Sequence, residues 1–131
     1  MSEENKKIKI LLIDDDRFLL DMYSIKFKTN NFDIETASGS MLALAKIKEG
    51  SNPDIILIDI IMPTMDGLEL LKVIRDEKLV PNSTIIMLTN QADEIEKAQS
   101  IGVDGYIIKA TSIPSEVVSQ VQNIYTNKHK K

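Results

Sequence analysis

Four short apolar runs of this 131-residue chain each end in a polar side chain suited to phosphoryl chemistry. Two runs end in acids, Asp15 and Asp59, and the other two end in a hydroxyl and an amine, Thr89 and Lys109. If the runs are parallel strands, their carboxyl ends share one edge of a sheet, where open α/β sheets place their sites. Acids that can hold a divalent cation, beside a hydroxyl and a fixed positive charge, indicate a site that handles phosphoryl groups.

Three consecutive acids, Asp14, Asp15 and Asp16, follow the first run. Taken alone, the triplet could be a helix N-terminus with favourable charge, and we expect Asp16 to cap the next helix. Asp14 and Asp15 should instead approach Asp59, and clustered carboxylates raise one another's pKa unless a cation neutralises them. Oxygen ligands without His or Cys favour Mg²⁺, so the sequence predicts a magnesium site.

Asp59 ends the most apolar run, where an unpaired acid is costly to bury. A carboxylate there can act as a nucleophile that accepts a phosphoryl group as an aspartyl phosphate. Ile61, two residues later, argues against a phosphatase of the haloacid dehalogenase type, because such enzymes need a second acid at that offset. The sequence therefore predicts a phosphoacceptor rather than an enzyme that turns over an external phosphoester.

Thr89 and Lys109 each have an ordinary alternative interpretation. Thr89 could cap the helix that follows it, and Lys109 could be a surface lysine. At matched strand ends, however, both side chains become donors to one phosphoryl group, the lysine as a point charge and the threonine as a neutral partner. The prediction that Thr89 and Lys109 contact a phosphoryl group depends on their placement together and on neither residue alone.

The elements that must position these residues alternate between short apolar runs and helical patterns. Strands are expected at residues 8–13, 32–37, 54–59, 84–88 and 105–109. Five helices follow them, the fourth over 93–101 and the last from Pro114 to about residue 126, with Ser38 or Ser40 opening the second. This predicts an α/β fold with a five-stranded parallel, doubly wound sheet in the flavodoxin-like order 2-1-3-4-5.

Composition and charge limit the function classes. The length fits a single domain, with an ordered core over about residues 8–126 and a basic tail over 127–131. A net charge of −4 gives no reason to expect nucleic-acid binding, and the chain has no cysteine. The longest apolar stretch, 55–62, contains an acid and is too short to span a membrane, and the polar first seven residues lack a signal peptide core. We expect a cytoplasmic protein.

Four segments resemble the receiver domain of two-component response regulators, over about residues 8–126. These segments are LLIDDD, PDIILIDIIMPTMDGLELL, IIMLTNQ and GVDGYIIKA. The resemblance implies that Asp59 is the phosphoacceptor and that Asp14 and Asp15 bind Mg²⁺, with Asp15 and Asp59 as direct ligands beside the backbone carbonyl of Ile61. It also implies that Lys109 pairs with Asp59, and that Thr89 moves toward the phosphoryl group in a switch coupled to Tyr106. From the residues alone, Tyr106 could also be a partly buried strand aromatic.

The resemblance further implies partners. A histidine kinase or phosphotransfer protein would phosphorylate Asp59, and spontaneous hydrolysis of the acyl phosphate would reset the domain. Phosphorylation would reshape the face formed by the fourth helix, fifth strand and fifth helix, which would bind a downstream protein or a second copy. The domain would be a monomer or an activation-dependent homodimer, without direct contact to nucleic acid or membrane.

Two positions depart from the receiver pattern. Ala110 stands where a proline joined by a cis bond usually follows the lysine, which predicts a trans bond and a slightly displaced Lys109. Asn90 stands where a small residue usually follows the threonine, so the phosphoryl lifetime could differ. These departures are the only support for an alternative, a scaffold that binds its partner without phosphorylation. A flavodoxin-like cofactor binder is disfavoured, because the acids at 14–16 would repel a phosphate and no Gly-rich loop is present.

Overall fold

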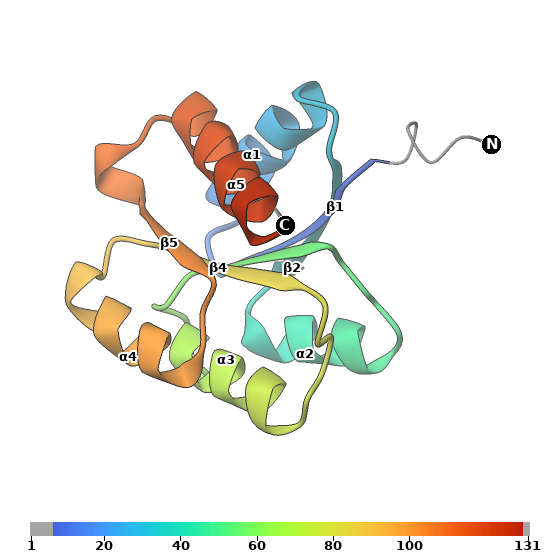
Figure 1. The fold of residues 1–131 in the computed structure, drawn as a ribbon, viewed down its shortest axis with the longest axis vertical. Coiled ribbons are helices and arrows are strands. Elements are labelled where there is room, and N and C mark those ends of the chain that lie inside the picture. The colour runs from blue at the N-terminus through green and yellow to red at the C-terminus, as the bar shows by residue number, and fades with distance from the viewer. Residues whose placement is uncertain (1–6, 130–131) are drawn as a thin grey trace.

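A computed structural model describes residues 7–129, and five parallel strands form its central sheet (Figure 1). The sheet order is β2-β1-β3-β4-β5, so the chain reverses its winding direction between β1 and β3. This confirms the predicted α/β fold class and strand order. The strands are β1 Lys9–Asp14, β2 Asp33–Ser38, β3 Ile55–Ile58, β4 Thr84–Thr89 and β5 Gly105–Ile108.

Helices cover both faces of the sheet. Figure 1 shows α1 and α5 on one face and α2, α3 and α4 on the other. Because right-handed crossovers place a helix after each parallel strand, a reversal in strand order is what distributes the helices over both faces. Their bounds are α1 Arg17–Thr29, α2 Ser40–Lys48, α3 Gly67–Asp76, α4 Ile95–Ile101 and α5 Pro114–Lys128.

The core consists of two apolar layers separated by the sheet. Alternate residues of β3 enter different layers, with Ile56 and Ile58 facing α2, α3 and α4, and Ile55 and Leu57 facing α1 and α5. All four side chains are fully buried. A strand buried on both faces needs a continuous apolar run, which explains the composition of β3 and leaves the first polar residue, Asp59, at its carboxyl end.

The strand register brings the predicted site residues to one level. Ile13 pairs with Ile58, so Asp14 and Asp59 follow at the same height on neighbouring strands. Thr89 pairs with Ile108, so Thr89 and Lys109 stand one step apart at the same edge. The carboxyl edge of the sheet therefore gathers residues that are up to 95 positions apart in the chain.

Helix starts follow the expected capping chemistry at some positions and differ at others. Asp16 caps α1 by accepting the backbone N–H groups of Phe18 and Leu19, as predicted. Helix α2 begins at Ser40, one of the two predicted starts, and its N-cap residue Gly39 makes no side-chain capping hydrogen bond. The predicted fourth helix is split, since a 3₁₀ turn at Ala92–Glu94 precedes α4.

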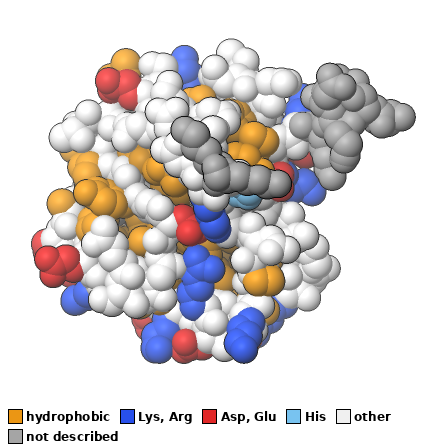
Figure 2. Space-filling view, in the orientation of Figure 1, with side chains coloured by type: hydrophobic (Ala, Val, Ile, Leu, Met, Phe, Trp, Pro, Cys, Tyr) orange, Lys and Arg blue, Asp and Glu red, His pale blue; other side chains and the backbone are white. Residues whose placement is uncertain are grey.

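The last helix runs further than predicted. Residues 127 and 128, assigned above to a basic tail, belong to α5, because the Lys128 ammonium lies 3.1 Å from Asp104 and 3.2 Å from the carbonyl of Ser83. Asp104 also pairs with Arg75 at 3.6 Å. Figure 2, in the orientation of Figure 1, shows acidic and basic side chains adjacent to one another near the centre of the face in view. The polar first six residues and Lys130–Lys131 lie outside the described part of the chain.

Within residues 7–129, the helices are all too short or too polar to cross a bilayer.

Candidate functional site

Three carboxylates meet at the carboxyl edge of the sheet. Asp14 is the last residue of β1, Asp15 follows it, and Asp59 follows β3. One carboxylate oxygen from each lies within 4.8 Å of the others. Asp14 and Asp59 are only 4% and 9% exposed, whereas Asp15 faces solvent. The cluster is therefore open on one side, which is the arrangement that a bound cation with water ligands requires.

Lys109 lies between two of these acids. Its ammonium donates to Asp14 Oδ2 at 2.9 Å and to Asp59 Oδ2 at 3.1 Å. The other oxygen of Asp14 accepts the backbone N–H of Asp16 at 3.0 Å. Both oxygens of Asp14 are thus engaged, so Asp15 and Asp59 are better placed than Asp14 to bind a cation directly.

The charges in the cluster shift the pKa values of its members. Burial raises the pKa of the Asp59 carboxyl; the charge of Lys109 opposes this rise and the charge of Asp14 adds to it. Burial alone would lower the pKa of Lys109, but its contacts with Asp14 and Asp59 raise it overall. The lysine is therefore held as a cation, and Asp59 is an acid whose negative charge is not fully compensated.

Thr89 ends β4, and Tyr106 lies on the neighbouring strand β5, two residues before the carboxyl end of that strand. The Thr89 hydroxyl is fully buried, accepts the N–H of Gln91 at 3.2 Å, and lies close enough to Asp59 to oppose the rise in its pKa. Tyr106 on β5 is 46% exposed, so its ring lies toward solvent. The structure thus brings Thr89 to the acids and leaves Tyr106 outside. The predicted coupling between them stays a prediction.

The loop after β3 is held against Asp59 by a glycine. The Gly67 N–H donates to the carbonyl of Ile60 at 2.8 Å, and a Cβ at Gly67 would overlap the carbonyl oxygen of Asp59. Asp66 caps α3 in a reciprocal capping box with Glu69, which fixes the direction in which the helix leaves the loop. The Ile61 side chain is 58% exposed in this loop; the role of its carbonyl as a metal ligand stays a prediction.

Two features of the site were missed by sequence reasoning. The Asn90 side chain accepts the N–H of Ala110 at 2.7 Å, so the two departures from the receiver pattern form one hydrogen bond. Adjacency of β4 and β5 in the predicted sheet was the signal that could have revealed it. Tyr23 on α1 is 4% exposed, and burial and the charge of Lys109 have opposite effects on its pKa, which is raised overall.

Lys109 is bound to both acids although the residue after it is not proline. Among residues 7–129 no peptide bond is cis, which confirms the predicted trans Lys109–Ala110 bond. The predicted displacement of Lys109 does not carry its ammonium out of contact with Asp14 or Asp59.

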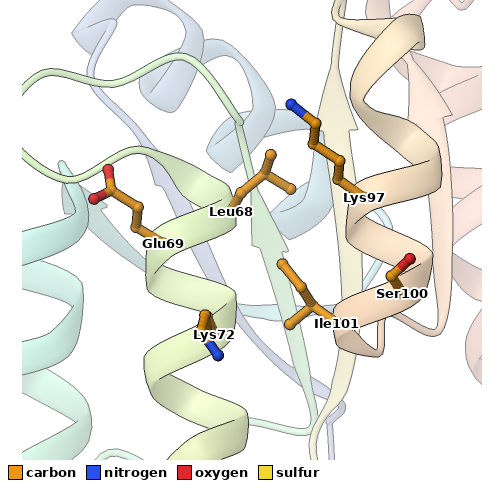
Figure 3. A pocket seen from close by; sticks show the side chains of 6 residues that line it. All are labelled: Leu68, Glu69, Lys72, Lys97, Ser100 and Ile101. Atoms are coloured by element: carbon orange, nitrogen blue, oxygen red, sulfur yellow. The ribbon is translucent and has the colours of Figure 1, made fainter.

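An apolar hollow of about 370 Å³ lies apart from these residues, between α3 and α4 (Figure 3). Leu68 and Ile101 point toward each other across it, and Lys72 and Lys97 extend from the two helices at its margin. Asp14, Asp15 and Asp59 are not among the residues that line it. It is separate from the acidic cluster.

The chain matches the response regulator receiver domain family over residues 10–122. It is 36% identical over 122 residues to the transcriptional regulatory protein ResD of Bacillus subtilis, covering 92% of this chain and 49% of that protein. It is 35% identical over 118 residues to the alkaline phosphatase synthesis transcriptional regulatory protein PhoP of the same organism, covering 88% of this chain and 48% of that protein. The chain thus spans about half the length of these curated relatives.

Solved structures agree with the fold. A CheY-like response regulator receiver domain protein from Methanospirillum hungatei superposes with a TM-score of 0.84 at 27% identity, covering 95% of this chain and 98% of that chain. The chemotaxis protein CheY4 of Vibrio cholerae superposes with a TM-score of 0.82 at 26% identity, covering 91% of this chain and 99% of that chain. Both are similar to this chain over nearly their whole length.

Proposed function

The chain belongs to the response regulator receiver domain family, and from that premise we propose that Asp59 is its phosphoacceptor and that Mg²⁺ is its cofactor. A kinase or phosphotransfer protein is the phosphodonor that membership of this family implies. The assignment of roles to Asp14, Asp15, Thr89 and Lys109 is part of the proposal.

One observation carries the proposal most directly. The Lys109 ammonium spans Asp14 and Asp59 at 2.9 and 3.1 Å, at the edge where β1 and β3 end. An ammonium fixed beside a nearly buried carboxylate can stabilise the negative charge that develops when a phosphoryl group is transferred. If Lys109 served only as a structural ion pair, one of the two acids would be sufficient as its partner.

The donor set fits Mg²⁺. The three acids supply only oxygen ligands and lie within 4.8 Å of one another, with solvent on the Asp15 side. Asp15 and Asp59 would hold the ion, and Asp14 would support it from the protein side. When bound, Mg²⁺ would neutralise the clustered carboxylates and screen the phosphoryl oxygens from them.

In the proposed reaction, an Asp59 carboxylate oxygen forms a bond to phosphorus. The bond between phosphorus and the donor atom breaks, and the donor keeps the electron pair. Lys109 pairs with the phosphoryl oxygens, and the Thr89 hydroxyl donates to one of them. In the reset step a water oxygen attacks phosphorus, the bond from phosphorus to Asp59 breaks, and inorganic phosphate and the Asp59 carboxylate are released. This autophosphorylation from small donors and autodephosphorylation would be the only chemistry of the domain.

The output of the switch is also proposed. Movement of Thr89 toward the phosphoryl group would draw Tyr106 inward and alter the face formed by α4, β5 and α5, which would bind a downstream protein or a second copy. We assign residues 8–126 to one receiver domain, an assignment that the family match over 10–122 supports. We place it in the cytoplasm as a monomer or an activation-dependent homodimer.

Acetyl phosphate tests the proposal without a kinase. The protein is incubated with this donor in the presence and absence of Mg²⁺, and its intact mass is recorded over time. We expect the wild type to gain one phosphoryl group only with Mg²⁺, and Asp59→Asn to gain none.

A matched control separates loss of the acceptor from loss of charge. Asp76 is an acid in an exposed pair with Lys72 at 3.0 Å, so Asp76→Asn should be phosphorylated at the wild-type rate. The absence of any mass gain in the wild type would reject the phosphoacceptor role and favour a scaffold that binds without phosphorylation. If Asp59→Asn gains a phosphoryl group to the same extent as the wild type, the domain is phosphorylated but Asp59 is not the phosphoacceptor.

A further inference from the structure

Asn90 and Ala110 connect the two loops that carry Thr89 and Lys109. The Asn90 Oδ1 accepts the backbone N–H of Ala110 at 2.7 Å, a short distance for a bond between neutral groups. The last paired residues of β4 and β5 are Thr89 and Ile108. The Asn90 side chain therefore extends the contact between these strands one step beyond the end of the sheet.

The bond acts on the peptide unit that directly follows Lys109. The carbonyl of this unit accepts the N–H of Ser112 at 3.2 Å, within the 3₁₀ turn Lys109–Thr111. Its N–H donates to Asn90, which lies in the loop after β4. The bond to Ser112 stays within the turn, whereas the bond to Asn90 links the unit to the loop that follows Thr89. The direction in which the Lys109 side chain leaves the backbone depends on this unit.

The two positions are chemically complementary. The acceptor comes from a carboxamide, and the donor exists because position 110 is not a proline, which has no N–H. Asn90 is anchored on its N-terminal side by Thr89, which is fully buried. The acceptor residue therefore directly follows the last paired residue of β4.

We propose that Asn90 is a positioning residue for Lys109, holding the Lys109–Ala110 peptide so that the ammonium reaches both Asp14 and Asp59. This inference rests on the proposed phosphoacceptor role of Asp59. Asn90 touches neither the acids nor the phosphoryl group in this account. Its effect on phosphorylation is exerted through Lys109 alone.

A double-mutant cycle on the phosphorylation rate tests the role. N90A removes the acceptor, A110P removes the donor, and the rate with acetyl phosphate and Mg²⁺ is measured for both single variants and the double variant. We expect N90A to slow phosphorylation by about 3- to 10-fold, the range that one hydrogen bond supports. In the A110P background, N90A should have no further effect, because the bond is already absent.

A matched control accounts for general destabilisation. The Asn30 side chain likewise makes one exposed hydrogen bond to the backbone, in which its Nδ2 donates to the carbonyl of Lys26 at 2.9 Å near the end of α1. N30A should lower the stability to a similar extent and leave the phosphorylation rate unchanged. If N90A acts only by destabilising the fold, N90A and N30A should slow phosphorylation to the same extent.

Hydrogen exchange of the Ala110 amide tests the bond independently of phosphorylation. N90A should speed this exchange by about 3- to 10-fold, and N30A should not change it. Unchanged exchange in N90A would overturn the inference even if the wild type is phosphorylated. Faster exchange with an unaltered phosphorylation rate, or an equal slowing by N90A in both backgrounds, would also overturn it. A wild type that is not phosphorylated would reject the proposed function and with it the role of Asn90.

Discussion

Replacing Asp59 by asparagine should stabilise the fold in the absence of metal. The Asp59 carboxylate is 9% exposed and lies in a cluster with two other acids and one lysine. Asparagine keeps the shape of the side chain and can accept the Lys109 hydrogen bond, but it carries no charge. The substitution therefore removes the buried charge and the repulsion while Lys109 keeps its pair with Asp14.

The magnitude follows from opposing terms in the cluster. At an effective dielectric constant of about 20, each acid within 4.8 Å repels Asp59 by about 3.5 kcal/mol, and less from the exposed Asp15. On the same basis Lys109 at 3.1 Å attracts Asp59 by about 5 kcal/mol. These terms nearly cancel, so the cost of burying the charge decides the sign. We expect Asp59→Asn to be more stable by about 1–2 kcal/mol, or about 4–8 °C in Tm.

The stabilisation should depend on pH in a defined direction. The pKa of Asp59 is raised above its ordinary value of 3.8 in the folded protein, mainly by burial. The folded state thus binds this proton more tightly than the unfolded state. The contribution of Asp59 to stability is complete below pH 3.8 and is lost as the pH rises through the folded-state pKa. The advantage of Asp59→Asn should therefore be small near pH 3.8 and full at neutral pH.

Urea unfolding at several pH values, with and without Mg²⁺, measures this difference. Mg²⁺ should reduce the difference in free energy of unfolding between Asp59→Asn and the wild type, because the cation stabilises the wild type more than a variant that lacks one ligand. Asp76→Asn, which loses only an exposed pair with Lys72, should stay within about 0.5 kcal/mol of the wild type. Two results would show that burial of the Asp59 charge does not destabilise the fold: an Asp59→Asn variant no more stable than the wild type at neutral pH without metal, or a stability difference that is independent of pH.

Three further substitutions test other parts of the structure by chemical unfolding. Lys109→Met should cost on the order of 3 kcal/mol, because it leaves two nearly buried acids without a cation; Mg²⁺ should restore much of this loss, and an equal loss with Mg²⁺ would contradict the account. Gly67→Ala should cost about 1–3 kcal/mol or more, since its Cβ would overlap the Asp59 carbonyl, and a neutral result would show that the loop can move away. Asp104→Asn should cost about 1–2 kcal/mol, because it removes the charge that pairs with Lys128 at 3.1 Å and with Arg75 at 3.6 Å; high salt should reduce the difference between the variant and the wild type.

The order of the sheet and the gathering of the acids were predictable because both follow from periodicity. A run such as Ile55–Ile58 is apolar at every position only when helices cover both faces, and alternation with helical patterns then requires parallel strands. Once the order was set, Asp14 and Asp59 had to be neighbours. Local propensity and topology were sufficient for this part of the site.

Contacts between loops were not predictable in the same way. The bond from Asn90 to Ala110 joins two segments without periodicity, and its existence depends on the exact exit angle of each strand. The extension of α5 to Lys128 likewise depends on Asp104, which lies 24 residues away and reaches the helix end only after the sheet has formed. Tyr23 has the spacing of a core residue, and the sequence carries no sign that its pKa responds to Lys109.

Mapping of the phosphorylated residue shows whether Asp59 is the phosphoacceptor. The wild type is treated with acetyl phosphate and Mg²⁺ and then with borohydride, which reduces an aspartyl phosphate to homoserine, and peptide mass spectrometry locates the change. We expect conversion at Asp59 and none at Asp14 or Asp15. Conversion at either of those acids, or at no aspartate, would contradict this role of Asp59.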